Sequence, residues 1–465
     1  MNAFTTMENR LDPASLPVAV IGAGPVGLAA AAHLIARGLP VRVYEAGAEV
    51  ASHIRSWGHV RLFSPWSYNI DKAACTLLEQ AGWRAPPANR HPTGAELVAD
   101  YVQPLAELPQ FKPAIETDAR IAAVSRLGYD KMKTPGREAA PFVLVMRKGD
   151  GGERQDLARA VIDCSGTWSR PNPMGAHGLA VPGEADISDR IAYGIPDVLG
   201  ADHAAYASAR TLVVGAGHSA ANVLLDLGRL AQQGLGTEIL WAVRGNSLAR
   251  LFGGGENDKL AERGALGRSL EAMTQAGDLD LHLGAGITAI RRDASALTVT
   301  LGSQQGSRVD VTVDRIVVAA GQRPDLEMLR EIRLDLDPAT ESPRALAPLI
   351  DPNVHSCGTV RPHGHRELTQ PDPGFYIAGI KSYGRAPTFL LATGYEQVRS
   401  IAAALAGDFT AADDVQLDLP ETGVCSSNLP VEGAENCAAP VEAVSGGCCG
   451  PAKPRIRVKA ASGCG

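Results

Sequence analysis

A short apolar strand that runs through three glycines into a helix constrains this chain more than any other feature. Residues 18–28 read Val-Ala-Val-Ile-Gly-Ala-Gly-Pro-Val-Gly-Leu, and the Ala-rich residues that follow, up to Ile35, favour a helix. Gly22 permits the tight turn, Gly24 lets the backbone approach a pyrophosphate, and Gly27 allows close packing of helix and strand. The phosphate charge would then lie at the helix N-terminus. The pattern predicts a dinucleotide-binding unit of α/β type.

The next apolar strand ends in an acid at the place of a ribose-binding carboxylate. Residues 41–44, Val-Arg-Val-Tyr, precede Glu45, which lies 23 residues after Gly22. A carboxylate at about this spacing hydrogen-bonds the ribose of a bound dinucleotide. Glycine-rich turns alone also serve packing, but two strands, a helix and the acid together favour dinucleotide binding.

A second copy of the pattern follows at residues 211–220, Thr-Leu-Val-Val-Gly-Ala-Gly-His-Ser-Ala. Gly215, Gly217 and Ser219 stand where a strand would turn into a helix. The next strand ends in Arg244, at the position that Glu45 holds in the first copy. Because an arginine can pair with a 2′-phosphate, this half is predicted to bind NADP; an ordinary exposed arginine is the alternative.

Three further segments are placed to meet a ligand. Residues 53–69 are rich in Trp, Arg and His and follow the first acid-bearing strand, so they are expected either to cover a cofactor or to pack as a loop. Residues 160–163 are strand-like and run into a Cys-Ser-Gly-Thr turn. Another strand reaches Gly379, and the helix expected over residues 388–405 offers its positive N-terminus.

Length and charge set the class of protein. The chain has 465 residues, enough for about three domains, and 45% of them are hydrophobic, as in a globular protein. No uninterrupted apolar stretch would span a membrane, and the first 17 residues do not resemble a signal peptide, so a cytoplasmic location is expected. A net charge of −7 without a basic stripe disfavours nucleic acid and favours a small-molecule substrate. A homo-oligomer is compatible with the sequence.

Five of the eight cysteines crowd the C-terminal end of the chain, and none forms a Cys-x-x-Cys pair. Few aromatic residues occur after Gly407, so the end of the chain is predicted to be disordered. Truncation after Asp408 is therefore expected to leave folding intact. The vicinal pair Cys448 and Cys449 offers soft thiols to a metal or metalloid, unless the tail is a dispensable extension.

The two nucleotide patterns in series resemble the two-dinucleotide-binding flavoproteins over residues 17–407. This resemblance implies an α/β fold with two Rossmann-like domains of three-layer ββα type, which bind FAD and NADPH. Residues 215–220 and the stretch Cys-Ser-Gly-Thr-Trp-Ser-Arg-Pro-Asn at 164–172 resemble class B flavin-containing monooxygenases. The segment from Phe375 onward also lacks the Gly-Asp of disulfide reductases.

One departure weakens the monooxygenase interpretation. The Phe-x-Gly-x-x-x-His signature of that class is missing from residues 186–197. More narrowly, residues 53–69 and 381–399, with the Cys-rich tail, resemble flavoproteins encoded with arsenic-resistance genes. Asn69 resembles, by position only, the asparagine that faces the flavin in related monooxygenases.

The resemblance implies a domain order and a reaction. An FAD-binding domain is expected at 17–200 and again at 326–407, an NADP-binding domain at 205–325, and a disordered tail at 408–465. The implied activity is an NADPH-dependent FAD oxidoreductase that uses molecular oxygen to oxygenate a small soft-heteroatom substrate, such as an organoarsenical. Two alternatives remain open: a reductase that serves a thiol, quinone or metalloid acceptor, and a non-catalytic flavin-bearing sensor or metalloid-binding protein.

Overall fold

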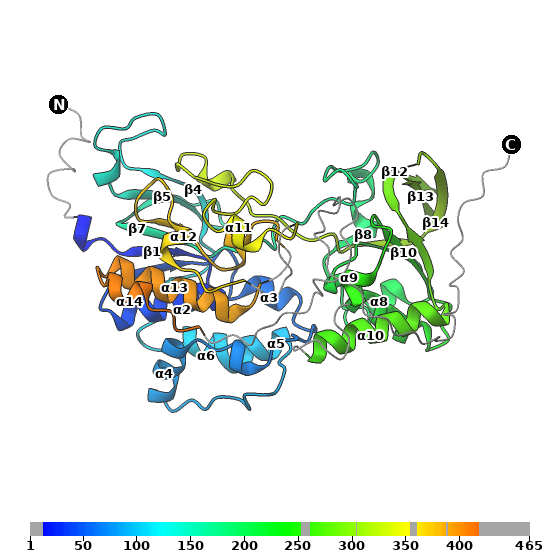
Figure 1. Ribbon diagram of the computed structural model, residues 1–465, viewed down its shortest axis with the longest axis horizontal. Helices are drawn as coiled ribbons and strands as arrows, with labels where there is room; N and C mark the ends of the chain where they lie inside the picture. The colour runs from blue at the N-terminus through cyan, green and yellow to red at the C-terminus, as the bar shows by residue number, and fades with distance from the viewer. Residues whose placement is uncertain (1–12, 253–260, 304, 354–359, 387–388, 418–465) are drawn as a thin grey trace, which may run out of the picture.

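Two α/β units lie side by side along the long axis of the computed structural model, which describes residues 13–252, 261–303, 305–353, 360–386 and 389–417 (Figure 1). The first unit is built on a parallel sheet with the strand order β16-β7-β1-β2-β3. A three-stranded antiparallel sheet, β4-β5-β6, lies over this parallel sheet. The strands of both sheets are β1 (Val18–Ile21), β2 (Val41–Tyr44), β3 (Ile115–Glu116), β4 (Arg120–Arg126), β5 (Phe142–Arg147), β6 (Glu153–Ala158), β7 (Ala160–Asp163) and β16 (Phe375–Ile377).

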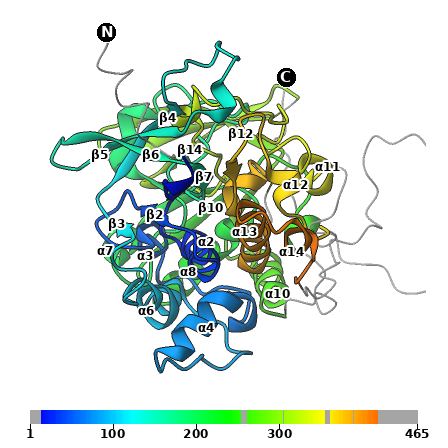
Figure 2. The same ribbon diagram turned by 90° about the vertical axis from the view of Figure 1, so that its left-hand side faces the viewer.

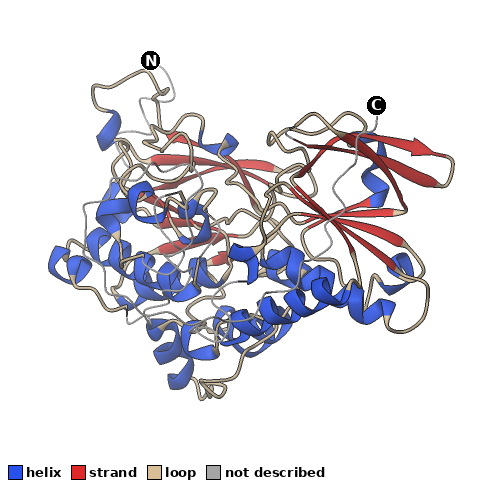
Figure 3. Cartoon of the chain, turned by 45° about the vertical axis from the view of Figure 1, so that its right-hand side comes forward, coloured by secondary structure: helices blue, strands red, loops and turns tan. Residues whose placement is uncertain are grey.

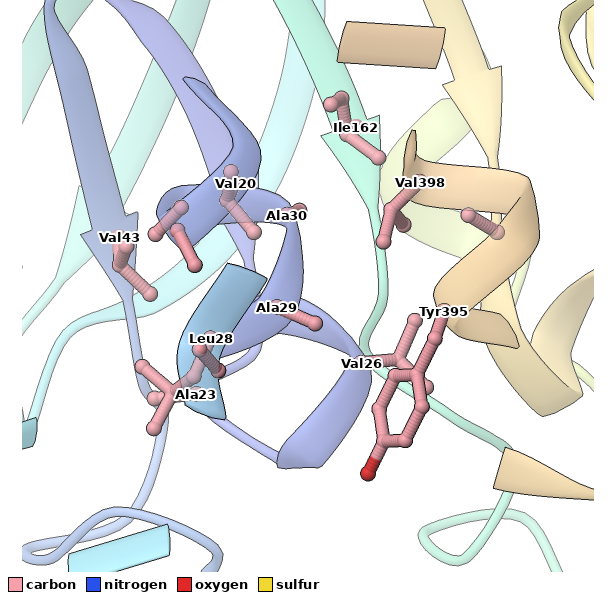
Figure 4. Close-up of a cluster of buried hydrophobic side chains, with 14 of the residues drawn as sticks. Val20, Ala23, Val26, Leu28, Ala29, Ala30, Val43, Ile162, Tyr395 and Val398 are labelled. Atoms are coloured by element: carbon pink, nitrogen blue, oxygen red, sulfur yellow. The ribbon is translucent and has the colours of Figure 1, made fainter. Parts of the chain in front are cut away.

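Alternation along β1 explains why the first unit has three layers. Successive side chains of a strand point to opposite faces, so Val18 and Val20 pack against the helices α2 (Pro25–Ala36) and α13 (Leu391–Leu405). Ala19 and Ile21 pack on the other face against the antiparallel sheet. Figure 4 shows side chains of the helical core, among them Val20, Ile162 and Val398. Figure 2 shows α2 and α13 next to each other.

The second unit repeats this plan. Its parallel sheet has the order β11-β10-β9-β15-β8, and β12-β13-β14 form the antiparallel layer. In Figure 3 the long helices of this unit lie on the opposite side of the parallel sheet from that layer. The elements are β8 (Ile191–Tyr193), β9 (Arg210–Val214), α8 (His218–Ala231), β10 (Glu238–Val243), α10 (Ala261–Ala276), β11 (Asp280–Leu283), β12 (Ala285–Asp293), β13 (Ala296–Ser303), β14 (Arg308–Val313) and β15 (Arg315–Val318).

Short helices connect these elements in both units. The α-helices are α3 (Ser52–Ser56), α4 (Lys72–Gln80), α5 (Gly94–Leu97), α6 (Gln103–Ala106), α7 (His203–Tyr206), α9 (Ala249–Phe252), α11 (Ala347–Ile350), α12 (His365–Leu368) and α14 (Phe409–Asp413). The turns of other helical types are η1 (Pro13–Ser15), η2 (Trp66–Tyr68), η3 (Val98–Val102), η4 (Arg137–Ala139), η5 (Ala185–Arg190), η7 (Glu327–Leu329) and η8 (Gly379–Tyr383). Within the described ranges, no helix has the length and apolarity needed to cross a bilayer.

The predicted fold class is confirmed: two Rossmann-like units, each with a ββα layer order. The domain boundaries stay a prediction, and β8 suggests one adjustment to them. This strand pairs with β15 of the second sheet, although it lies before residue 205. Met174 and Ile187 also pack in the second core. We therefore propose that the second unit begins near residue 174.

The predicted start of a disordered tail at residue 408 is too early. Residues Phe409–Asp413 form α14, and the Asp408 carboxylate caps it by accepting from the Ala411 amide at 3.0 Å. The buried guanidinium of Arg399 donates to the carbonyl oxygens of Ala411 and Asp414. These contacts hold residues 409–414 against α13.

Because α14 packs on α13, removal of residues 409–465 should destabilise the protein, contrary to the expectation from composition that truncation after Asp408 leaves folding intact. Loss of the Arg399 contacts should lower the free energy of unfolding by about 3 kcal/mol, since hydrogen bonds to charged groups contribute about 1.5–3 kcal/mol each. Urea denaturation measures the change. A chain truncated after Leu417, which keeps α14, is the control and should match the full-length protein; equal stability of all three chains would show that α14 contributes nothing.

Candidate active site

A cavity of about 680 Å³ is lined by residues of both units. The first unit contributes the glycine turn after β1, most of residues 51–64, the turn after β7 and the start of η8. The second unit contributes the first residues of α8. The carboxyl ends of parallel strands are where open α/β sheets bind ligands.

The first glycine turn has the construction expected of a pyrophosphate cradle. Gly22 adopts φ +100°, and a Cβ there would lie 2.8 Å from the carbonyl oxygen of Cys164. A Cβ on Gly27 would lie 1.9 Å from the Gly22 oxygen, so both positions need glycine for packing. A Cβ on Gly24, by contrast, would meet no atom within 4 Å, and Gly24 lines the cavity. Space for a ligand therefore lies directly at the N-terminus of α2.

Glu45 lies directly after β2 and lines the cavity with its carboxylate nearly buried. One oxygen accepts from the Ala23 amide at 2.9 Å, and the other accepts from the Ser52 hydroxyl at 2.7 Å. The Gly47 amide donates to the same oxygen as Ser52, at 2.9 Å. A carboxylate offers about four lone-pair sites, so one remains for a ribose hydroxyl.

The second glycine turn copies the first. Gly215 has φ +131°, and a Cβ there would lie 2.3 Å from the Ala319 carbonyl oxygen, at the end of the neighbouring strand. A Cβ on Gly217 would meet no atom within 4 Å. Neither glycine lines the cavity, whereas His218 and Ser219, the first two residues of α8, do. The N-terminus of α8 thus faces the same cavity as the first turn.

Arg244 lies outside the cavity lining. It follows β10 directly, as Glu45 follows β2. Its exposed guanidinium donates to the carbonyl oxygen of Ala176 at 2.9 Å. The remaining donors of this side chain are available to a nucleotide phosphate.

Asn69 is fully buried and does not line the cavity. Its amide nitrogen donates to the carbonyl oxygens of Ser64 and Pro65, at 2.8 and 3.1 Å. Its amide oxygen accepts from the Ser64 hydroxyl at 2.9 Å. In this structure Asn69 therefore holds the loop behind Ser64, which itself lines the cavity.

Aromatic side chains close one wall of the cavity. The rings of Trp57 and Trp168 lie with their centroids 6.3 Å apart, and Phe63 lies 5.4 Å from the ring of His218. His53 lines the same wall, and burial lowers the pKa of its imidazole. The aromatic loop expected over a ligand thus contributes to the cavity. The sequence patterns did not single out Trp168 and His218, because their proximity to this loop depends on how the units meet.

The cavity lining also includes the turn after β7 and the start of η8. Cys164, Ser165 and Gly166 come from the first, and Gly379 and Ile380 from the second. Burial and the neighbouring Asp163 carboxylate raise the pKa of the Cys164 thiol well above its ordinary value. This thiol is therefore protonated at neutral pH and is a poor nucleophile.

Cys448 and Cys449, the expected soft-metal ligands, lie outside the described residues. Within the part of the chain that is described, no group of three or more His, Cys, Asp or Glu side chains could hold a metal ion.

Family models match two parts of the chain. Residues 17–110 match the model described as FAD dependent oxidoreductase, and residues 190–356 match the model described as flavin containing amine oxidoreductase. The first match spans the glycine turn and Glu45, and the second spans the second glycine turn. A search of the curated proteins finds no match.

Several solved flavoenzymes share the fold. Bacillithiol disulfide reductase from Bacillus cereus is 20% identical with a TM-score of 0.61, and the matched region covers 84% of this chain and 99% of the reductase chain. The FAD-bound cadaverine monooxygenase from Erwinia amylovora is 13% identical with a TM-score of 0.61, covering 90% and 99%. Ornithine N-hydroxylase from Kutzneria sp. 744, with reduced FAD and NADP+, is 16% identical with a TM-score of 0.54, covering 85% and 98%.

At these identities the solved structures show the fold, which reductases and monooxygenases share. The family matches add the cofactor, because the model that covers the first glycine turn is one of FAD-dependent oxidoreductases. The cradle at Gly24 and the carboxylate of Glu45 fit that cofactor. The chain is therefore an FAD-dependent oxidoreductase.

Proposed function

We propose that this protein is an NADPH-dependent flavin monooxygenase, with FAD at the first glycine turn and NADPH at the second. The observation that carries the proposal is that Gly24 and the start of α8 face one cavity. Hydride transfer requires the nicotinamide and the flavin ring to lie within reacting distance. A single cavity reached from both turns meets that requirement. The FAD and NADP+ held by the similar Kutzneria enzyme support the choice of cofactors.

Different residues would bind the two nucleotides. Gly24 and the N-terminus of α2 would hold the FAD pyrophosphate, and Glu45 its adenosine ribose. Gly215, Gly217 and Ser219 would hold the NADPH pyrophosphate, with Arg244 on the 2′-phosphate. Bound FAD would supply two-electron chemistry, taking a hydride from NADPH and passing electrons to oxygen.

The aromatic wall would exclude water from the reacting groups. Trp57, Trp168 and Phe63 present large apolar surfaces to the cavity. A dry site protects reactive oxygen chemistry from wasteful side reactions. Asn69 would act behind this wall by holding Ser64 in place, and we propose no direct contact with the flavin.

The cysteine content of the cavity lining favours oxygenation over thiol–disulfide exchange. Cys164 is the one cysteine among the described residues that line it, and its raised pKa keeps the thiol protonated. Exchange needs an accessible thiolate, and a second thiol or disulfide to react with.

We expect Cys164→Ser to retain NADPH oxidation within about twofold, because a protonated, packed thiol supplies no nucleophile. The rate of NADPH consumption in air measures this, with FAD content as the control. Complete loss of turnover in a fully FAD-loaded variant would favour the reductase that transfers electrons through a thiol.

An isotope experiment tests the proposed reaction directly. In the balanced reaction, NADPH, a proton and O₂ convert the substrate to its oxide with NADP+ and water. Turnover under ¹⁸O₂ should place one labelled oxygen atom in the product. NADPH oxidation that proceeds without oxygen when a quinone or disulfide is added, and that places no label in any product, would identify a reductase.

We propose a small substrate with a soft heteroatom, with trivalent organoarsenicals as the first compounds to assay. The support is the sequence similarity of residues 53–69 and 381–399 to flavoproteins encoded with arsenic-resistance genes. Cys448 and Cys449 are proposed as ligands that deliver or retain such a metalloid. Cytoplasmic action is part of the proposal, since NADPH and reduced thiols are maintained there.

A further inference from the structure

A buried ion pair lies beside the cavity and is not used in the proposed reaction. The Lys381 ammonium lies 2.6 Å from a carboxylate oxygen of Asp163, and both side chains are 0% exposed. Removing two charges from water carries a desolvation penalty that their attraction often only offsets. Stabilisation of the fold alone is therefore a weak explanation for this buried ion pair.

The pair joins the two backbone turns that form one edge of the cavity. Asp163 ends β7 and precedes Ser165, while Lys381 lies in η8 with Gly379. Ser165 and Gly379 both line the cavity. In sequence the two partners are 218 residues apart, so this contact joins two distant segments of the chain.

Ser165 connects the buried ion pair to the cavity. Its hydroxyl donates to Asp163 Oδ1 at 2.6 Å and accepts from Lys381 Nζ at 3.0 Å. A hydroxyl has one donor and two acceptor sites. The Ser165 hydroxyl is thereby left with one lone pair, and it can only accept a hydrogen bond from a ligand in the cavity.

The turn that carries Lys381 is held from its other side as well. The buried amide of Gln397 accepts from the Gly379 backbone N–H at 2.7 Å and donates to the Ser382 hydroxyl at 2.9 Å. One side chain that does not line the cavity, Gln397, thus holds η8 at both Gly379 and Ser382. The position of Gly379 against a ligand depends on these contacts.

We propose that Lys381 is a positioning residue for FAD: with Asp163 it fixes Ser165 as a hydrogen-bond acceptor and sets the spacing of the two turns. The inference rests on FAD occupying the cavity and adds a role that cofactor binding by glycine turns does not require. Loss of the pair should weaken FAD binding and change the environment of the flavin.

The test is the double variant Lys381→Met with Asp163→Asn, which leaves no buried charge without a partner. We expect the dissociation constant for FAD to rise about tenfold, as loss of one hydrogen bond between FAD and the Ser165 hydroxyl would cause. The visible absorption maxima of the bound flavin should also shift. FAD titration of the apoprotein and the spectrum of the loaded protein give the two readouts, and the melting temperature of the apoprotein reports folding.

The control is a second buried ion pair, Arg137 and Asp372, 2.9 Å apart and outside the cavity lining; Asp372 also lies 3.8 Å from the buried guanidinium of Arg126. Arg137→Met with Asp372→Asn should lower the melting temperature and leave FAD affinity and spectrum unchanged. Ser165→Ala, which keeps the ion pair, should reproduce the spectral shift, and it tests the same inference if the double variant does not fold.

Two different failures can be told apart. Wild-type FAD affinity and spectrum in both the double variant and Ser165→Ala would overturn the positioning role. Wild-type protein that neither retains nor binds FAD would instead overturn the proposed occupancy of the cavity.

Discussion

Gly24→Val should yield folded protein that purifies without FAD and does not oxidise NADPH. Gly24 has φ −78° and ψ −178°, a conformation that valine adopts without strain, and a Cβ there meets no atom within 4 Å. The fold therefore tolerates the side chain, whereas a pyrophosphate at the N-terminus of α2 would collide with it. Flavin absorbance per polypeptide and the melting temperature of the apoprotein are the measurements.

The second glycine turn provides the matched control. Gly217 has the same extended conformation and the same open space at its Cβ. Gly217→Val should keep FAD and raise the KM for NADPH. Full FAD occupancy in Gly24→Val would contradict the assignment of the first turn, and loss of FAD in both variants would show that valine at either turn disturbs the fold.

The glycine turns could be predicted because their requirements are local. Gly22 and Gly215 occupy positive φ, and each lies against the carbonyl of a neighbouring strand end. Apolar strands that lead into such turns are visible in a short window of sequence. Both dinucleotide-binding units could be found from these windows, whereas their three-layer order was implied by the resemblance to two-dinucleotide-binding flavoproteins.

What could not be predicted depends on contacts between distant parts of the chain. The pairing of β8 with β15 joins segments more than 100 residues apart, and three residues of edge strand carry no pattern of their own. Asp163 and Lys381 likewise meet only in the folded protein. A signal for α14 was present, because Asp408 is a good N-cap residue, but composition had suggested disorder.

Positional similarity was least informative for Asn69. A primary amide carries two donors and an acceptor, and burial requires partners for them. Ser64 and Pro65 supply those partners five and four residues away. Local hydrogen bonding thus determines the orientation of the Asn69 side chain. Its position in the sequence, similar to that of an asparagine in related proteins, does not predict this orientation.

Arg244 is expected to determine the choice between NADPH and NADH. Arg244 takes the place after β10 that Glu45 takes after β2, so the two units differ in charge where an adenosine ribose would lie. An acid there favours a free 2′-hydroxyl, and an arginine favours a 2′-phosphate. The single contact to the Ala176 carbonyl leaves the Arg244 guanidinium with donors for a bidentate pair.

We therefore expect Arg244→Ala to raise the KM for NADPH and to leave that for NADH nearly unchanged. Loss of a charged hydrogen bond costs about 1.5–3 kcal/mol, which corresponds to about 10- to 150-fold. Steady-state kinetics with both nucleotides measure the ratio, and Arg229→Ala on the exposed side of α8 is the control. Because Arg244 also contacts Ala176, an equal loss with both nucleotides would mean that it supports the loop at residues 174–181 and does not select the cofactor.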